Sequence, residues 1–282
     1  MSYTLFKEGE YISTDKKILE NSLVYAILFL PGSGIQNSRR MNMESRNIRI
    51  AFMSDLHYSP FPNLACPSRM GHKILQKLEW VVGELNQNIK PDLVLCGGDL
   101  INDPKAENAE QLLRELAERF ETLKMPCTVI RGNHDPEQEI FTKYFPFHPV
   151  SDCSFVRILA FDDVETPGYN AVRTPGDLER MKKDLASWKG ICLSLQHTPL
   201  TVKGNCVFGY DNAPEILEIL KESNCCGTLS GHYHEGEALY EKESLQFFVQ
   251  SALCEAPFHF SLLEITEGTG ITSVKEYAVP EL

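Results

Sequence analysis

Five apolar segments of this chain each end in a short polar motif, and this recurrence constrains the fold more than any other feature of the sequence. In chain order the motifs are Asp55-x-His57, Gly98-Asp99, Gly132-Asn133-His134-Asp135, Gln196-His197 and Gly231-His232-x-His234. Between the first three motifs, residues 70–89 and 107–123 place apolar side chains at helical spacing. This alternation of strand and helix predicts an α/β core with parallel strands.

The chain is interpreted as one large domain preceded by an appendage. Residues 1–46 contain one apolar run, at 23–30, and lack the regular pattern that starts at Asn47. We interpret 1–46 as an N-terminal appendage or an over-extended start, and 47–282 as a single domain with one sizeable core. The apolar run is too short to cross a bilayer, so no membrane span is predicted. Read instead as part of a signal peptide, it lacks a good cleavage site.

The second half of the domain shows a less regular pattern. The segments expected there are a strand over 154–162, a loop over 165–177, helices over 177–188 and 213–223, and only short strands from about 236 to 278. Asp177 is the predicted N-cap of the first of these helices.

The residue types in the five motifs suit a metal site. The carboxyl ends of strands in an open α/β sheet line one crevice, so the motifs are expected to meet in space. Carboxylate, carboxamide and imidazole groups are oxygen and nitrogen ligands for borderline-hard divalent metals, and no thiolate stands among them. A spacing of two, as in Asp55-x-His57, points both side chains to the same side of an extended segment. Five of the eight histidines occur in these motifs, and that concentration predicts a metal centre.

In this order the motifs resemble those of the calcineurin-like metallophosphoesterase family. That family has the pattern DxH, GD, GNHD or GNHE, a single His, and GHxH. The chain reads SDLH, GGD, GNHD, QH and GHYH, with no ligand position substituted. The resemblance extends from residue 47 to about 266. It implies an α/β fold, namely a four-layer α-β-β-α sandwich with two mixed sheets.

The resemblance also implies a role for each motif residue. One metal would be held by Asp55, His57 and His234, the other by Asn133, His197 and His232, and both by Asp99. His134 would face the substrate without binding metal, and Asp135 would orient its ring. The cofactors implied are two divalent or trivalent ions, with Mn, Fe and Zn all suited to such ligands.

These roles define a reaction. Two metals that share a bridging water lower its pKa, which provides a hydroxide for in-line attack on phosphorus near neutral pH. His134 would donate a proton to the leaving oxygen or stabilise its charge. The predicted function is therefore two-metal-dependent hydrolysis of a phosphoester.

Charge and motif details narrow the substrate. A formal net charge of -12 disfavours extended nucleic acid but allows a small phosphorylated substrate at a metal-bearing cleft. The segment after Asp99 lacks the arginine-bearing GDxxxR pattern of the protein-phosphatase branch and is more similar to the small phosphodiesterase branch. That branch often has two histidines where this chain has Gln196-His197, which leaves a cyclic nucleotide open. A small phosphodiester is favoured, with a phosphomonoesterase or a non-enzymatic scaffold as the alternatives.

Other residues receive structural interpretations. The nine cysteines are odd in number and form no CxxC pair, so reduced, buried thiols and a cytoplasmic location are predicted. His72, His148 and His259 are expected to be structural, and Asp103, Asp152, Asp162 and Asp163 to be turn or cap residues. Solvated loop positions are favoured over substrate contacts for Tyr58 and Arg69, whereas Tyr210 and Asn212, in the loop after His197, are candidates for the border of the cleft.

Overall fold

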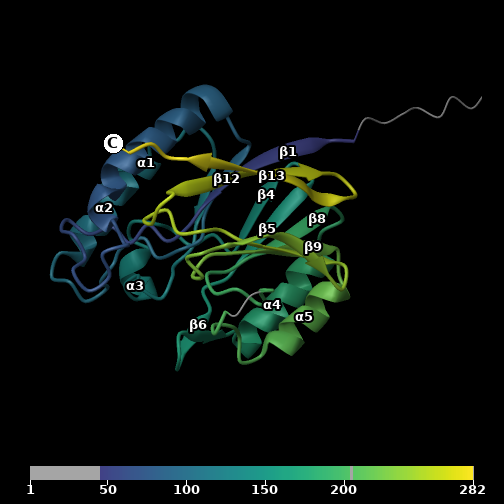
Figure 1. Cartoon of the computed structure of the whole chain (residues 1–282). Helices are drawn as coiled ribbons and strands as arrows, with labels where there is room; N and C mark the ends of the chain where they lie inside the picture. Colours follow the sequence, from purple (N-terminus) through teal and green to yellow (C-terminus); the bar gives the residue numbers. More distant parts are fainter. Residues whose placement is uncertain (1–44, 204–205, 282) are drawn as a thin grey trace, which may run out of the picture. The chain divides into compact units, whose positions relative to one another are not determined.

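The computed structural model describes residues 45–203 and 206–281 (Figure 1). A five-stranded sheet has the order β13-β12-β1-β2-β3. Its strands are β1 (Asn47–Met53), β2 (Leu93–Cys96), β3 (Cys127–Val129), β12 (His259–Thr266) and β13 (Gly270–Ala278). Strands β1, β2 and β3 run parallel, whereas β12 is antiparallel to both β1 and β13. The sheet is therefore mixed.

A second, six-stranded sheet has the order β10-β11-β9-β8-β5-β4. Its strands are β4 (Val150–Cys153), β5 (Val156–Ala160), β8 (Ile191–Leu195), β9 (Cys225–Ser230), β10 (Glu237–Lys242) and β11 (Leu245–Val249). The four inner strands are parallel, and the edge strands β4 and β10 are antiparallel to their neighbours. This sheet is mixed as well, as the sequence resemblance implied.

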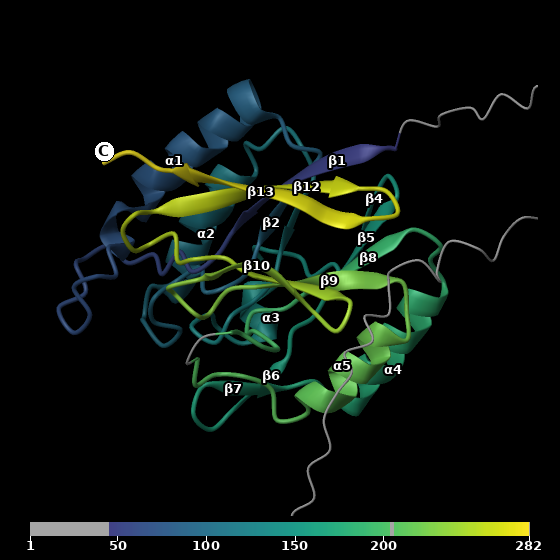
Figure 2. The ribbon, with the colours of Figure 1, turned by 45° about the vertical axis from the view of Figure 1, so that its right-hand side comes forward.

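Helices cover the outer face of each sheet, as Figures 1 and 2 show. The helices are α1 (Ile74–Glu84), α2 (Ala109–Phe120), α3 (Gln138–Phe141), α4 (Pro175–Ala186) and α5 (Ala213–Lys221). A 3₁₀ turn (Gly71–Lys73) precedes α1, and a π-helical turn (Leu85–Ile89) continues it. Helices α1 and α2 pack on the first sheet and α4 and α5 on the second. The four layers are those expected of the α-β-β-α sandwich.

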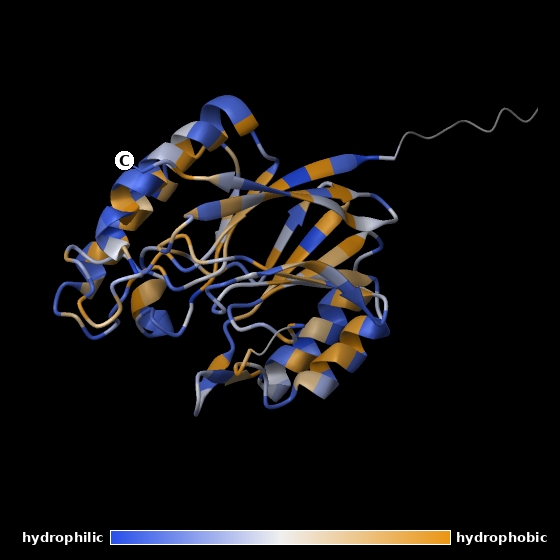
Figure 3. Cartoon of the chain, in the orientation of Figure 1, coloured by the Kyte–Doolittle hydropathy of each residue, from blue (hydrophilic) through white to orange (hydrophobic). Residues whose placement is uncertain are grey.

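The alternation of side chains along β1 shows how the layers hold together. Ile50 and Phe52 point into the core between the two sheets, whereas Ala51 and Met53 point toward α1 and α2. The covering helices carry separate hydrophobic and hydrophilic bands (Figure 3). Each sheet thus buries both faces, which explains why its parallel strands read as continuous apolar runs.

The segment 165–177, expected as a loop, contains more structure than predicted. Strands β6 (Val164–Thr166) and β7 (Asn170–Val172) form a small antiparallel hairpin. Helix α4 begins earlier than predicted, and its N-cap is Thr174, whose hydroxyl accepts from the backbone N–H of Asp177 at 3.1 Å. The N-cap prediction for Asp177 was wrong because Pro175 sets the first helical turn, which moves the cap one residue ahead of the proline.

Two further expectations can be compared with the structure, and a third lies almost entirely outside the described residues. The interpretation of 1–46 as an appendage concerns residues that lie, apart from 45 and 46, outside the described part of the chain. None of the helices described is long and apolar enough to cross a membrane. All nine cysteines are free thiols, and four of them are fully buried.

Candidate metal centre

The predicted site residues all follow strands whose carboxyl ends meet at one edge of the sandwich. Asp55 and His57 follow β1, Asp99 follows β2, Asn133 follows β3, His197 follows β8, and His232 and His234 follow β9. Backbone hydrogen bonds join the neighbouring loops: Asp55 N donates to Gly98 O at 3.0 Å, and Gly231 N donates to His197 O at 2.9 Å. Parallel pairing within each sheet, together with the packing of the two sheets on each other, therefore brings together residues that are up to 179 positions apart in the chain (234 − 55).

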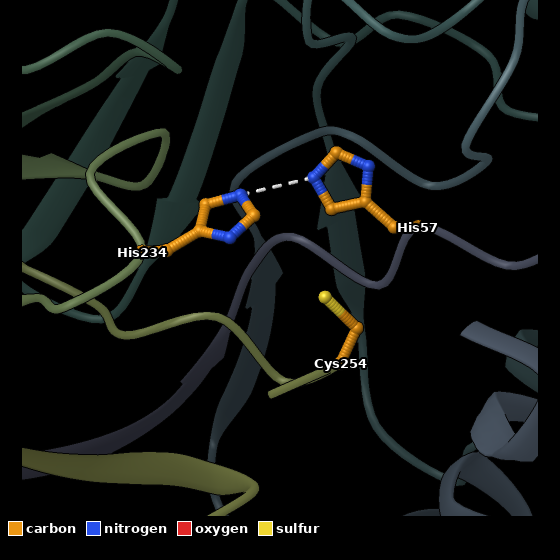
Figure 4. A group of neighbouring side chains, drawn as sticks. All are labelled: His57, His234 and Cys254. Atoms are coloured by element: carbon orange, nitrogen blue, oxygen red, sulfur yellow. Dashed lines mark hydrogen bonds between the residues drawn. The ribbon is translucent and has the colours of Figure 1, made fainter. Parts of the chain in front are cut away.

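The first cluster of donors lies around His57. Its Nε2 is 3.1 Å from Nε2 of His234 and 3.4 Å from Oδ2 of Asp99. Nε2 of His234 is in turn 3.5 Å from Oδ1 of Asp55. Figure 4 shows the two rings facing each other, with the thiol of Cys254 beside them.

The second cluster lies around His197. Its Nε2 is 3.3 Å from Oδ2 of Asp99, 3.2 Å from Oδ1 of Asn133 and 3.1 Å from Nδ1 of His232. The same oxygen of Asp99 is thus close to His57 in the first cluster and to His197 in the second. The carboxylate of Asp99 lies between two groups of donors.

The chemistry of these donors fits two metal ions. In each cluster two imidazole nitrogens face each other at 3.1 Å, next to a carboxylate oxygen. His197, His232 and His234 each donate their other ring N–H to a carbonyl or carboxylate oxygen, so in their neutral form the facing nitrogens carry lone pairs that point at a common space. A cation in that space is bound by all of them at once. Oxygen and nitrogen donors of this kind suit Mn, Fe or Zn.

Burial and charge set the protonation of the site. Burial opposes the charged form of both Asp99 and His197, but their mutual attraction outweighs it, so the pKa of Asp99 is well below its usual range and the pKa of His197 rises to about 10. Burial lowers the pKa of His57 well below its usual value, and burial together with the charge of His197 lowers the pKa of His232 to about 3. Burial also raises the pKa of Asp55. His57 and His232 are therefore neutral, as metal ligands must be.

His134 lies beside the clusters rather than within either pair of facing nitrogens. Its backbone N–H donates to Oδ1 of Asp99 at 2.7 Å, and its ring is edge-on to the ring of His57, with 4.7 Å between centroids. Nδ1 of His134 is 2.8 Å from the carbonyl oxygen of Asn102. A carbonyl only accepts, so Nδ1 carries the proton and Nε2 is the nitrogen left free to act.

The carboxylate of Asp135 bonds to backbone groups, and among the described residues no hydrogen bond joins it to the ring of His134, which the resemblance implied it would orient. Its carboxylate accepts from the backbone N–H groups of Leu100 at 2.8 Å, Ile101 at 3.1 Å and Gly132 at 2.9 Å. Asp135 thus ties the loop after β2 to the loop after β3. Burial and the nearby charge of Asp99 raise its pKa to about 7.

The backbone of the site is unusual in conformation. Asp55, His57, Asp99 and His232 all have positive φ, at 56°, 46°, 53° and 65°. Such angles are uncommon outside glycine and persist where the surrounding structure enforces them. At Gly132 a Cβ atom would collide with the carboxylate of Asp99, so this position requires glycine.

Sequence reasoning missed the groups that hold the ligand rings from behind. Nδ1 of His234 is 2.8 Å from Oε1 of Glu255, Nδ1 of His197 is 2.7 Å from Gly97 O, and Nε2 of His232 is 3.0 Å from Tyr169 O. Backbone carbonyls leave no mark in a sequence. Glu255 lies in a turn after β11, and no motif distinguishes it from other surface glutamates.

A cleft opens beside His197 and His232. Its lining includes Asn133, Arg131, Asp162, Asp163, Glu165, Tyr169, Asn170 and Tyr210. The acids predicted to be turn residues form ion pairs, Asp162 with Arg131 and Asp163 with the fully buried Arg173, each at 2.9 Å.

The four cleft candidates have different outcomes. Tyr210 lines the cleft and donates its hydroxyl to Asp163 at 2.6 Å. Asn212 instead donates to the carbonyl of Arg173 at 3.0 Å. Tyr58 is buried and donates to Glu115 at 2.5 Å, so its interpretation as a solvated loop residue was wrong. Arg69 is 4.0 Å from Glu255.

Comparisons with known proteins agree with this architecture. The profile of a family described as calcineurin-like phosphoesterase matches residues 48–236. A dimetal phosphatase from Danio rerio has a similar structure, with a TM-score of 0.65 and 12% identity over 83% of this chain and 99% of that one. GAP50, the anchor in the inner membrane complex of Plasmodium, matches with a TM-score of 0.54 and 10% identity over 83% and 90%. Identities this low show the fold alone.

Sequence comparison finds a relative that matches part of this chain. An uncharacterized protein of Schizosaccharomyces pombe is 35% identical over 100 residues, which make up 33% of this chain. The match spans about a fifth of that protein's length, 19%.

Proposed function

This chain belongs to the calcineurin-like phosphoesterase family, and on that premise we propose that it hydrolyses a small phosphodiester with the help of two metal ions. Membership makes it a metallophosphoesterase, a hydrolase that acts on phosphoester bonds, with a dimetal site formed from its His and Asp clusters. The diester substrate, the ligand assignment and the metal identity are the proposal.

One observation carries the ligand assignment. Oδ2 of Asp99 lies 3.4 Å from Nε2 of His57 and 3.3 Å from Nε2 of His197, and so faces both donor clusters. One ion is assigned to Asp55, His57 and His234, the other to Asn133, His197 and His232, and Asp99 to both. Mn, Fe and Zn are the candidate metals.

The chemistry is divided between the ions and His134. When bound, the ions supply an activated nucleophile near neutral pH and neutralise charge on the phosphoryl oxygens. The Asn102 carbonyl holds Nδ1 of His134, which leaves Nε2 to donate a proton to the leaving oxygen once the ring is protonated. The backbone N–H of His134 bonds to Asp99, so the acid is held at a fixed place relative to the metal ligands.

The cleft supports a diester over a monoester. A diester keeps one ester group while the other leaves, and the cleft beside His197 and His232 offers that second group a polar site. The family's frequent second histidine is replaced by Gln196, which is buried and accepts from Ser194 at 2.7 Å, so it does not contribute to substrate binding. The net charge of -12 favours a small substrate over a nucleic-acid chain.

A reducing, cytoplasmic location is part of the proposal. It is supported by nine thiols that are all unpaired in the structure, several of them buried.

The proposal is tested with two chromogenic esters, bis-p-nitrophenyl phosphate and p-nitrophenyl phosphate, with Mn²⁺ added or with EDTA. We expect Mn²⁺-dependent release of p-nitrophenol that is faster from the diester, and its loss with EDTA. Faster release from the monoester would favour the phosphomonoesterase. No metal-dependent turnover of either ester would favour a non-enzymatic scaffold, and GAP50 of Plasmodium, with the same fold, is described as an anchor.

A further inference from the structure

The β6–β7 hairpin and residues 209–211, in the loop that follows His197, form one hydrogen-bonded unit at the mouth of the cleft. The backbone N–H of Gly209 donates to the side chain of Asn170 at 3.0 Å. Ala171 N donates to Gly209 O at 2.9 Å, and Asp211 N donates to Ala171 O at 2.9 Å. Two segments that are distant in the chain are therefore held together by backbone bonds at adjacent positions.

This unit is attached directly to a predicted metal ligand. The carbonyl of Tyr169, at the hairpin tip, is 3.0 Å from Nε2 of His232. The ring of Phe208 packs edge to face on His232 with 4.6 Å between centroids, and the ring of Tyr169 packs on Phe208 at 6.3 Å and 84°. A row of three rings thus leads outward from the metal centre and ends at Tyr169.

The backbone of Tyr169 is in a strained conformation. Its φ is 61°, a left-handed value that a non-glycine residue seldom adopts, and 58% of the residue is exposed although it is a large aromatic. Strained residues of this kind concentrate at ligand-binding sites. A ring held in place by Phe208 and exposed on its other side is a ready surface for stacking.

The rest of the cleft is polar. Arg131 is paired with Asp162, and Asp163 is paired with Arg173, so these charges are already compensated. Glu165 lines the cleft, and the described residues include no hydrogen-bond or ion-pair partner for it. An alkyl group would find little apolar surface here, whereas a heteroaromatic ring offers a face to Tyr169 and a polar edge to Glu165 or Arg131.

We propose that Tyr169 stacks on a planar heteroaromatic ring carried by the ester group that occupies this cleft, so that the substrate is a diester of the nucleoside type. This inference rests on the proposed phosphodiesterase function. It assigns the hairpin to substrate selection, with Phe208 as a positioning residue behind Tyr169. Stacking is tolerant of the ring's identity, since every base has a π face.

The test uses three diesters that all release p-nitrophenol and differ only in the second alcohol: thymidine monophosphate p-nitrophenyl ester, p-nitrophenyl phosphorylcholine and ethyl p-nitrophenyl phosphate. With Mn²⁺-loaded full-length protein we expect kcat/KM to be roughly tenfold or more higher for the thymidine ester than for the ethyl ester, as one base–aromatic stack provides. The preference should lie mainly in KM.

Variants then test whether the ring of Tyr169 causes the preference for the thymidine ester. Tyr169→Leu should reduce the preference to about twofold or less, because it removes the ring and keeps the backbone carbonyl that bonds to His232. Tyr169→Phe should retain the preference. Phe61→Leu is the matched control, since Phe61 is an aromatic that is 73% exposed on a different loop. Equilibrium binding of thymidine monophosphate should weaken in Tyr169→Leu alone.

The outcomes separate this inference from its premise. Three results overturn the stacking site but not the proposed phosphodiesterase function. They are turnover of all three esters without preference, a preference that Tyr169→Leu leaves intact, and an equal fall in kcat/KM for all three esters in Tyr169→Leu. A preference for the choline ester overturns it too and assigns the cleft to a cation held by Glu165 and an aromatic face. Absence of Mn²⁺-dependent turnover on all three overturns the proposed function itself.

Discussion

The two sheets contribute unlike halves to the metal centre. Asp55, His57 and Asp99, from the first sheet, are at most 1% exposed. From the second sheet, the side chain of His234 is 18% exposed, and His232 is held by a hairpin tip. The first-sheet half, which we call the sealed half, thus holds three of its ligands in the core, with Asn133 beside them at the cleft, and the second half borders the solvent.

The difference extends to what supports each half. The loops of the first sheet are joined by the buried carboxylate of Asp135, which bonds only to backbone. Two rings of the second sheet, those of His234 and His232, are backed by Glu255 and by the carbonyl of Tyr169, which belong to surface segments. In the proposed assignment the first half holds the ions and His134 in place, and the second connects the ions to the substrate cleft.

The strongest test of this division is a change at Asp99, the residue that lies between the two halves. Asp99→Asn removes the charge that faces both clusters, so we expect loss of both ions and a fall in kcat of about 10⁴-fold or more. Metal analysis by mass spectrometry and steady-state kinetics measure the two effects. Retention of one full equivalent of metal would show that Asp99 serves a single ion.

His134→Ala should separate catalysis from metal binding within the sealed half. The ring contacts the Asn102 carbonyl and belongs to neither pair of facing nitrogens, so both ions should remain bound. Loss of a general acid lowers kcat by about 10²–10⁴-fold. The same metal analysis and kinetics apply, and metal lost together with activity would contradict the assignment.

Glu255→Ala tests the support of the solvent-facing half. Glu255 accepts from Nδ1 of His234 at 2.8 Å, and loss of such a partner weakens metal affinity about 10–100-fold. Competition with a chelator should show one of the two ions bound more weakly. Glu235→Ala is the control, because that exposed carboxylate bonds only to Tyr233. Equal effects of both changes would indicate a general charge effect.

Asp135→Asn tests how much the hydrogen bonds of Asp135, which join two loops of the sealed half, contribute to stability. An amide cannot accept from all three backbone N–H groups, and its own NH₂ would face buried donors, so unfolding should become easier by about 1–3 kcal/mol. Urea unfolding of the metal-free protein gives the value. Unchanged stability with lost activity would restore a catalytic role for Asp135.

The smallest expected effect is the release of a proton from the protein when metal binds. In the metal-free protein the pKa of His197 is raised to about 10 from its ordinary value of 6.5, so at pH 7 the ring is charged. A metal binds only the neutral ring, so binding releases about one proton, and affinity rises as the pH rises toward 10. Calorimetry in buffers with different ionisation enthalpies counts the proton. No release would mean that His197 is neutral before the metal binds.

The sequence by itself determined the parallel strands and the composition of the centre, whereas the four layers were implied by the resemblance to a family. The alternation of apolar runs with helical segments indicated parallel strands, and parallel strands bring the motifs after them to one edge. Asp55, Asp99, His197 and His234 could therefore be grouped without any coordinates, because their positions follow from local pattern and sheet geometry.

Only the tertiary structure decided what supports and surrounds the centre. The bond of Asp135 to backbone, the contact of His232 with Tyr169, and that of His234 with Glu255 join residues whose spacing has no periodic signal. Positive φ at Asp55 or His57 is likewise imposed by the surrounding loops and not by residue type. Local pattern determines which groups reach the edge of a sheet, and packing between remote segments determines what they touch there.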